Sequence, residues 1–125
     1  MRFLTAKSHN VQSNFSYITW QELIDKIINP PNLGKLQVKQ AKNKAAIVGA
    51  SDAPNKQKET VKSHNNFTLL RLDLDDTPLT ANEIKQGLLK LNLTSFAIHT
   101  TISHQDNSAL NRYRIYIQLA NAIGL

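Results

Sequence analysis

The sequence contains no cysteine among its 125 residues, which excludes a disulfide framework and any metal site built on thiolates. It also lacks a run of about 18 apolar residues, so we expect no transmembrane helix and no membrane partner. The apolar stretch near Met1 is too short for a signal peptide. These absences make a cytoplasmic protein the default expectation. The length predicts a single domain, 1–125, and 41% apolar residues suffice for a core.

Negative charge is also scarce, because nine acidic residues face 15 lysines and arginines and the net charge is +6. Such a balance favours a polyanionic partner such as nucleic acid or a nucleotide, although many small soluble proteins are basic without one. The two signs are unevenly distributed along the chain. Acidic residues cluster at 73–76, whereas the middle of the chain is rich in lysine, namely Lys35, Lys39, Lys42, Lys44, Lys56, Lys58 and Lys62.

The stretch 67–76 is predicted to form one β-strand that ends in acidic residues. Side chains alternate along a strand, so one face would carry Asp73 and Asp75 while the other would pack on a core. Residues two apart on a strand lie roughly 6.5–7 Å apart at Cα. Two carboxylates this close repel unless a positive charge lies between them, and a divalent cation is the usual solution. The core face would consist of Leu70, Leu72 and Leu74.

An alternative interpretation of the same stretch is a strand followed by an aspartate-rich turn that leads into a helix. This interpretation explains Asp76 well and Asp75 adequately. It does not explain Asp73, because aspartate is disfavoured inside strands.

The N-terminal half of the chain gives weaker signals. Residues 2–7 are typical of a short strand, and Thr19 with Glu22 predicts a helix that begins with a capping box. Residues 45–50 are typical of a short buried strand. Residues 51–66 are polar and lysine-rich, and they predict a mobile loop that either contacts phosphates or is a solvated linker.

The C-terminal half predicts a helix that begins at Thr80 and two strands, at 96–104 and 112–119. Residues 67–119 therefore have the outline of a β-α-β-β unit. The strands that flank the helix would be parallel neighbours or near-neighbours, and the last two would form a hairpin. The fold class that fits best is α+β, a mixed sheet with helices packed on one face.

This arrangement would place several polar residues at one edge of the sheet. The acidic residues and His104, with Ser103 beside it, come at the C-terminal ends of their strands, and the hairpin returns Arg112 and Arg114 to the same edge. Arginine suits phosphate because its planar fork donates two hydrogen bonds, and histidine can donate to phosphate or act as an acid or base. Together the residues predict a site for a metal–triphosphate. The alternatives are a solvated His104, a sheet histidine at 99 whose hydrogen bonds are satisfied, and an exposed arginine face.

The residues at 72–76, 99–104 and 112–119 resemble three segments of the archaeo-eukaryotic primase superfamily. The likeness is greatest to the primase-polymerase-like domains of phage and plasmid replication proteins, and it covers about residues 67–122. These proteins share an acidic motif, a motif centred on a small residue and a histidine, and a strand that begins with arginine. Their catalytic core is built on a sheet like that of the RNA-recognition motif.

The resemblance implies a catalytic role for the acidic strand and the histidine. Two aspartates would bind catalytic Mg²⁺ or Mn²⁺ with a third as an additional candidate ligand, and the second and third motifs would contact the nucleotide phosphates or the template. The implied catalytic residues are Asp73, Asp75 and His104; the metal ligands are Asp73, Asp75 and Asp76; the phosphate-binding residues are Ser103, His104, Arg112 and Arg114.

One departure from the family concerns a third acidic motif on a later strand. After Gln105 the chain offers only Asp106, in a predicted turn. We therefore expect either the N-terminal part of a longer replication protein or a short version without a full metal site. The expected function is a nucleotidyltransferase domain that binds a nucleoside triphosphate and a single-stranded DNA template, with a helicase domain or replication partner as a further expected partner. The alternatives are a non-catalytic nucleic-acid-binding module that uses Tyr113 and Tyr116, and a nicking initiator or histidine phosphoesterase. A nicking initiator or histidine phosphoesterase needs a pair of histidine motifs, and this chain has only one such motif.

Overall fold

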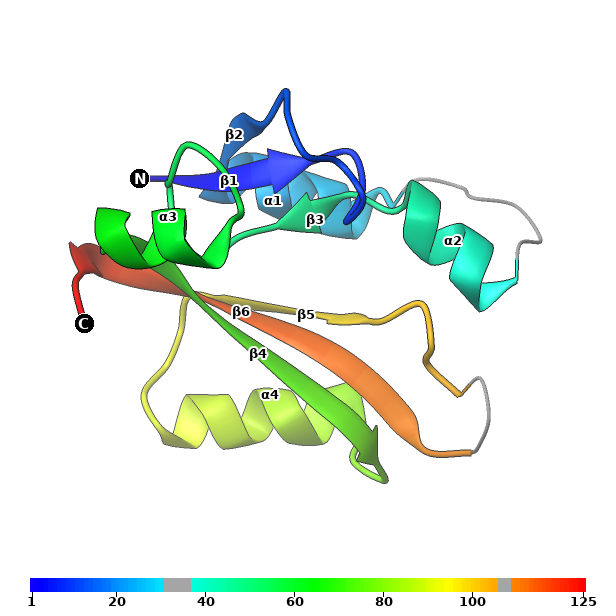
Figure 1. Ribbon diagram of the computed structural model, residues 1–125. Coiled ribbons are helices and arrows are strands. Elements are labelled where there is room, and N and C mark those ends of the chain that lie inside the picture. The colour runs from blue at the N-terminus through cyan, green and yellow to red at the C-terminus, as the bar shows by residue number, and fades with distance from the viewer. Residues whose placement is uncertain (31–36, 106–108) are drawn as a thin grey trace. The chain divides into compact units, whose positions relative to one another are not determined.

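The computed structural model describes residues 1–30, 37–105 and 109–125 (Figure 1). The chain divides into two compact units, the first formed by residues 1–70 and 119–125 and the second by residues 71–118. In chain order the elements are β1 (Arg2–Ala6), β2 (Ser16–Thr19), α1 (Trp20–Ile28), α2 (Val38–Lys44), β3 (Ile47–Val48), α3 (Lys58–His64), β4 (Phe67–Thr77), α4 (Ala81–Lys90), β5 (Phe96–Thr100) and β6 (Asn111–Ile123).

The first unit contains a three-stranded antiparallel sheet with the strand order β2-β1-β3. β1 confirms the strand predicted at 2–7, and β3 confirms the short strand predicted within 45–50. Phe3, in the central strand, is completely buried. The other buried apolar residues of this unit include Leu4, Ile18, Leu23, Val48 and Leu69.

Helix α1 begins where its sequence signal predicts. The hydroxyl of Thr19 accepts a hydrogen bond from the amide of Glu22 at 3.3 Å, as an N-cap residue does. The same hydroxyl lies 3.2 Å from the Glu22 carboxylate, to which it donates. In the described part of the chain, no helix combines the length and the apolar character that are needed to cross a membrane.

The lysine-rich segment 51–66 differs from the predicted loop. Residues 58–64 form α3, and Ser51 forms an antiparallel bridge with Phe67. Helix α3 ends at His64 and is capped by Asn65, whose left-handed backbone (φ 49°) is a conformation that asparagine commonly adopts at a helix terminus. The prediction of a loop was therefore wrong for residues 58–64.

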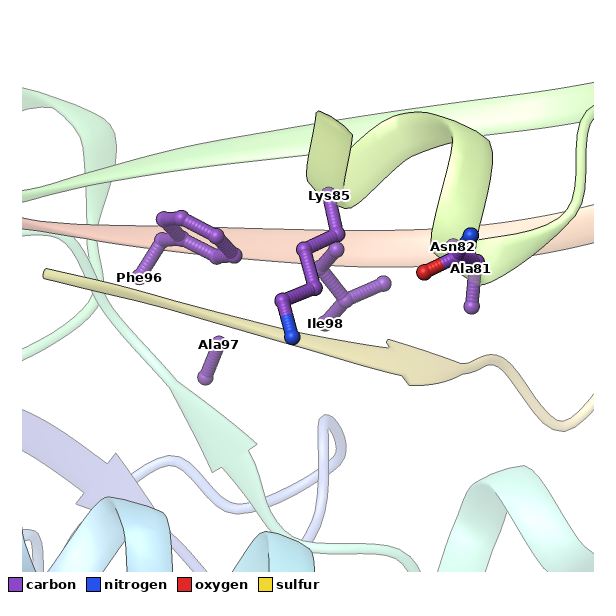
Figure 2. A pocket seen from close by; sticks show the side chains of 6 residues that line it. All are labelled: Ala81, Asn82, Lys85, Phe96, Ala97 and Ile98. Carbon is purple, nitrogen blue, oxygen red and sulfur yellow. The ribbon is translucent and has the colours of Figure 1, made fainter. Parts of the chain in front are cut away.

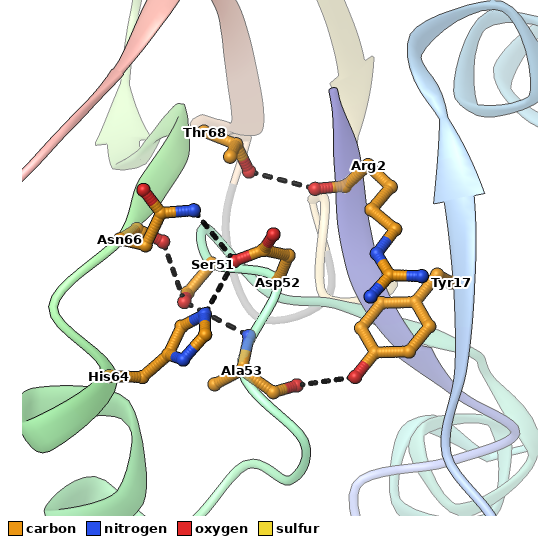
Figure 3. Close-up of polar contacts among 8 residues, drawn as sticks. All are labelled: Arg2, Tyr17, Ser51, Asp52, Ala53, His64, Asn66 and Thr68. Atoms are coloured by element: carbon orange, nitrogen blue, oxygen red, sulfur yellow. Dashed lines mark hydrogen bonds and ion pairs between the residues drawn. The ribbon is translucent and has the colours of Figure 1, made fainter.

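Polar side chains provide several contacts within this segment (Figure 3). The Asp52 carboxylate lies 2.7 Å from Nε2 of His64 and accepts from the side-chain amide of Asn66 at 2.9 Å. The buried hydroxyl of Ser51 donates to the Asn66 carbonyl at 2.8 Å and accepts from the amide of Ala53. Since hydropathy patterns detect only apolar burial, this source of order is invisible to them.

The second unit contains the predicted succession of strand, helix, strand and strand. Its sheet has the order β4-β6-β5, so the last strand lies between the two strands that flank the helix. β5 and β6 are antiparallel, with His99 opposite Arg114. The prediction of an α+β fold is confirmed, but the sheet is antiparallel and not mixed, because β6 separates the strands that would otherwise form a parallel pair.

Helix α4 covers one face of this sheet (Figure 1). It begins with the predicted capping box, in which Thr80 accepts from the amide of Glu83 and the Glu83 carboxylate accepts from the amide of Thr80. The core that the helix closes consists of Ile84, Leu88, Tyr113, Ile115 and Ile117, with Leu74, Leu93, Phe96 and Ile98 packed against it.

The leucine face of β4 is only partly buried. Leu74 packs against the core, whereas Leu70 and Leu72 are 44% and 41% exposed. The physical reason is length: an eleven-residue strand extends about 36 Å, but a ten-residue helix covers only about 15 Å of it. The prediction that all three leucines face a core therefore holds for one of them.

Strand β5 ends at Thr100, four residues before the predicted end. The amide of Thr101 donates to the carbonyl of Arg112, and the amide of His104 then donates to the carbonyl of Thr101. These two bonds close a turn, so His104 lies in a turn and not on a strand.

Two leucines that follow one another in α4 test the assignment of the core. Leu88 is 8% exposed and Leu89 is 39% exposed. Replacing Leu88 with alanine should lower the free energy of unfolding by about 2–4 kcal/mol, because it leaves a cavity in the core. Replacing Leu89 with alanine should change it by less than about 1 kcal/mol. Urea denaturation followed by circular dichroism measures both, and equal losses would contradict the orientation of α4.

Candidate functional site

The acidic end of β4 lies beside the arginines of β6. The Asp73 carboxylate accepts two hydrogen bonds from Arg114, from Nε to Oδ1 at 2.6 Å and from Nη2 to Oδ2 at 3.2 Å. This is the bidentate geometry that arginine forms with carboxylates. The contact lowers the pKa of Asp73 and raises the pKa of Arg114. The negative charge of Asp73 is therefore already balanced within the protein.

The next two aspartates share the other arginine. Nε of Arg112 lies 3.4 Å from Oδ1 of Asp75 and 3.4 Å from Oδ1 of Asp76. Consecutive strand residues normally face opposite sides of a sheet. Asp76 has a left-handed backbone (φ 50°), a conformation that aspartate tolerates better than most residues, and both carboxylates can therefore approach one guanidinium.

These two interactions are ion pairs without a directed hydrogen bond. Nε of Arg112 is buried and has no hydrogen-bond partner among the described residues, although both carboxylates lie within 3.4 Å. Attraction between the charges does not require alignment, but a hydrogen bond does. The Arg112 side chain is 29% exposed, against 55% for Asp75 and 61% for Asp76. The acidic residues are thus the part of this cluster that solvent and ligands reach most easily.

The register explains why the pairs form. Asp73 pairs with Arg114 and Asp75 pairs with Arg112, so a step of two forward on β4 corresponds to a step of two backward on β6. This relation is that of one face of an antiparallel ladder. Sequence reasoning identified all four residues but missed their pairing. The available signal was the equal spacing of opposite charges on two strands, which becomes informative only when the strands are known to be neighbours.

His104 joins the same cluster through the backbone of Arg112. The amide of Arg112 donates to Nδ1 of His104 at 3.0 Å, and the Arg112 carbonyl lies 3.2 Å from that nitrogen. When Nδ1 accepts, the proton of the neutral ring is on Nε2, which becomes the donor. Ser103 lies in the same turn and is half-buried. The turn therefore presents a histidine donor next to the arginine that holds two carboxylates.

The turn between β4 and α4 is held to the start of β6. The side-chain amide of Asn111 donates to the carbonyl of Leu79 at 2.9 Å, and the hydroxyl of Tyr113 donates to the same carbonyl at 3.1 Å. Sequence reasoning gave Asn111 no role. The two contacts restrain the chain that follows Asp76.

His99 and the two tyrosines are engaged within the protein. The ring of His99 stacks on Tyr116 with centroids 5.5 Å apart, and Nδ1 of His99 lies 2.7 Å from the Thr100 carbonyl. Burial lowers the pKa of His99 and raises the pKa of Tyr116. Tyr113 and Tyr116 are 5% and 3% exposed, so the prediction that they stack on nucleic-acid bases is wrong.

The donor chemistry of the cluster suits a hard divalent cation, but the number of donors is small. Carboxylate oxygens are the ligands that Mg²⁺ and Mn²⁺ prefer. Within the described residues, no group of three or more histidine, cysteine, aspartate or glutamate side chains could hold a metal ion. Asp106 lies outside the described residues. A cation at Asp73 or Asp75 would therefore compete with arginine and need oxygen ligands from its substrate or from water.

A separate hollow of about 350 Å³ lies between α4 and β5 (Figure 2). Lys85 is its one charged lining residue among those described, and none of the predicted site residues lines it. The hollow is lined by Ala81, Asn82, Lys85, Phe96, Ala97 and Ile98. The predicted site is thus the charged cluster, and this apolar hollow is not part of it.

No family model matches the sequence, and neither the curated proteins nor the solved structures contain a match. Any functional assignment must therefore rest on the residues themselves and on their geometry.

The bidentate pair predicts a pH-dependent contribution to stability. The folded pKa of Asp73 is lowered, so the pair stabilises the protein above the unfolded pKa, near 3.8, and is lost as pH falls through the folded value. Asp73→Asn should therefore lower the free energy of unfolding by about 0.5–1 kcal/mol at neutral pH, since the pair is partly exposed. Denaturation curves between pH 7 and pH 2 should show this difference shrinking in acid.

A double-mutant cycle separates the pair from other effects of the substitution. Asp73→Asn should cost little in a chain that already carries Arg114→Gln, because the partner is gone. Equal costs in the two backgrounds would show that Asp73 acts through something other than Arg114.

Proposed function

We propose that the chain is a primase-polymerase-like nucleotidyltransferase domain of a mobile-element DNA replication protein. In this function it binds a nucleoside triphosphate with Mg²⁺ or Mn²⁺ and a single-stranded DNA template. The observation that carries the proposal is the cluster around Arg112: two aspartates from β4 lie at its guanidinium, and His104, from the connection between β5 and β6, contacts its backbone. The sequence had predicted that these residues, which come from three separate segments, lie at one edge of the sheet.

The topology of the second unit supports the proposal. An RNA-recognition-motif-like sheet has the third of its strands between the first two, with a helix between those two in the sequence. The order β4-β6-β5, with α4 between β4 and β5, agrees with this arrangement for three strands. The proposal includes this fold assignment and a cytoplasmic location.

The proposed site works by an exchange of partners. Without ligand, the arginines neutralise the aspartates. With a metal–triphosphate bound, Asp73 and Asp75 would hold the cation, and Arg114 and Arg112 would hold the phosphate oxygens, which their planar forks fit. The exchange conserves charge pairing throughout, so no carboxylate or guanidinium is left without a partner.

The remaining groups of the site orient the nucleotide. With Nδ1 held by the Arg112 amide, His104 directs a donor Nε2 to a phosphate oxygen, and Ser103 lies beside it. Asp76 is an additional candidate ligand. The bound metal would lower the pKa of the attacking 3′-hydroxyl and stabilise negative charge on the phosphate. Two-metal chemistry needs more oxygen ligands than Asp73 and Asp75 supply, so we propose that the chain works within a larger replication protein or beside a helicase partner.

Calorimetry of Mn²⁺-dependent binding tests the proposal. The wild-type chain should bind a nucleoside triphosphate with Mn²⁺ and lose that binding when Mn²⁺ is chelated. Asp73→Asn should weaken it by about tenfold or more, as loss of metal-site partners does. Asp25→Asn, which removes a carboxylate on α1 of the other unit, should have no effect. Wild-type binding by Asp73→Asn would show that the assignment is wrong.

The exchange makes a second, opposite prediction for the arginine. Arg114→Gln should raise the affinity for Mn²⁺ alone by about threefold to tenfold, because it frees Asp73, yet it should weaken binding of the metal–triphosphate. Lys90→Gln, at the exposed end of α4, removes the same charge without touching the cluster. Titrations with Mn²⁺ alone and with Mn²⁺ plus nucleotide separate the effects, and an unchanged affinity for Mn²⁺ would contradict the exchange.

A second candidate function is a non-catalytic nucleic-acid-binding module. Each aspartate already has an arginine partner, and the described residues offer no larger group of metal ligands. These observations favour a cluster that is structural. This function predicts salt-sensitive DNA binding with no requirement for metal, together with no Mn²⁺-dependent binding of a nucleoside triphosphate in the calorimetric experiment.

A further inference from the structure

The net positive charge of the chain comes from one of its two units. The first unit contains ten of the 15 lysines and arginines but only four of the nine acidic residues, and so it carries the whole net charge of +6. The second unit, which holds the aspartate–arginine cluster, is electrically balanced. A polyanionic partner would therefore be attracted to the first unit.

Part of that charge surrounds a hollow of about 540 Å³ beside α3. We call it the α3 groove; the lining residues that matter here are Lys56, Lys58, Lys62 and Phe67. Lys58 and Lys62 are four residues apart on the helix and so lie on the same face, about 5–6 Å apart at Cβ. None of the described residues that line the groove has an acidic side chain.

The lysines of the groove are available to a ligand. The ion pairs of the described chain involve arginine and histidine but no lysine. Lys56 donates one hydrogen bond to the carbonyl of His9, which leaves two of its three N–H donors. The nearby Asp52 carboxylate is held by His64 and Asn66 (Figure 3).

The helix that presents these lysines is held at its C-terminal end. His64 contacts Asp52, and the side-chain carbonyl of Asn65 accepts from the amide of Leu125 at 2.8 Å. The aromatic ring at the groove belongs to Phe67, which is half-buried and bridged to Ser51 through the backbone. The groove therefore combines lysines on an anchored helix with an aromatic surface.

We propose that the α3 groove binds the backbone of a single-stranded nucleic acid, with phosphates at Lys58 and Lys62 and an unpaired base against Phe67. Positive charge that follows the backbone, combined with aromatic rings for the bases, is the chemistry by which proteins hold single strands without sequence preference. The choice of nucleic acid as the polyanion rests on the proposed function. The α3 groove belongs to the first unit, whereas the aspartate–arginine cluster belongs to the second. Binding to the groove can therefore be measured without metal or nucleoside triphosphate.

Fluorescence anisotropy with a labelled oligothymidylate of about 12 nucleotides measures this binding. The double variant Lys58→Gln/Lys62→Gln should bind roughly tenfold more weakly at low salt. For this variant, the slope of log affinity against log salt concentration should be smaller in magnitude by about 1.4. The matched control is Lys39→Gln/Lys42→Gln, which removes the same charge from exposed positions of α2. Wild-type binding by the first variant, or an equal loss in both, would overturn the proposal.

Two further arms test the stacking and the independence of the groove. Phe67→Leu should weaken oligothymidylate binding by about fivefold or more while the salt slope stays unchanged, and a duplex of equal length should bind less tightly than the single strand. Equal binding of duplex and single strand, with no effect of Phe67→Leu, would refute a single-strand site. Asp73→Asn should bind the oligonucleotide like the wild type, so failure of the nucleotide site and failure of the groove give different results.

Discussion

The second unit depends on the position of β6 between β4 and β5. This position places arginines opposite aspartates on one face of the sheet, while the other face of β6 supplies tyrosine and isoleucines to the core under α4. Were β4 and β5 adjacent, the acidic end of β4 would lack the counter-charge that its spacing demands. One strand thus supplies apolar side chains to the core and counter-charges to the aspartates.

Carboxylates that are already paired with arginine impose a condition on any ligand. A bare cation would have to displace a guanidinium and leave it without a partner, and a bare phosphate would do the same to a carboxylate. A ligand that brings both signs, such as a metal–triphosphate, replaces both partners at once. In the proposed function this condition gives the cluster its selectivity. The excess positive charge belongs to the other unit, where a polyanion could be held without disturbing the pairs.

Local signals in the sequence predicted much of the fold. The N-cap at Thr19 and the capping box at Thr80 were correct because capping depends on residues three positions apart. The box predicted at Thr19 forms only in part, because the Glu22 carboxylate accepts from the Thr19 hydroxyl and not from its amide. The order of elements in the second unit followed from periodicity. The end of β5 was missed because the amide of His104 donates to the carbonyl of Thr101 and closes a turn there. The helix α3 was missed because the contacts around Asp52 are polar.

The sequence by itself determined which residues of the site carry charge, which strands carry them and which face of each strand they occupy, since these properties follow from residue type and alternation. Only the tertiary structure decided that the aspartates and arginines face one another, that Tyr113 and Tyr116 are buried, and that the lysines of α3 line a groove. These facts depend on which strands are neighbours and how they are registered. That information comes from contacts between residues some 40 positions apart, such as Asp73 and Arg114, and not from local spacing.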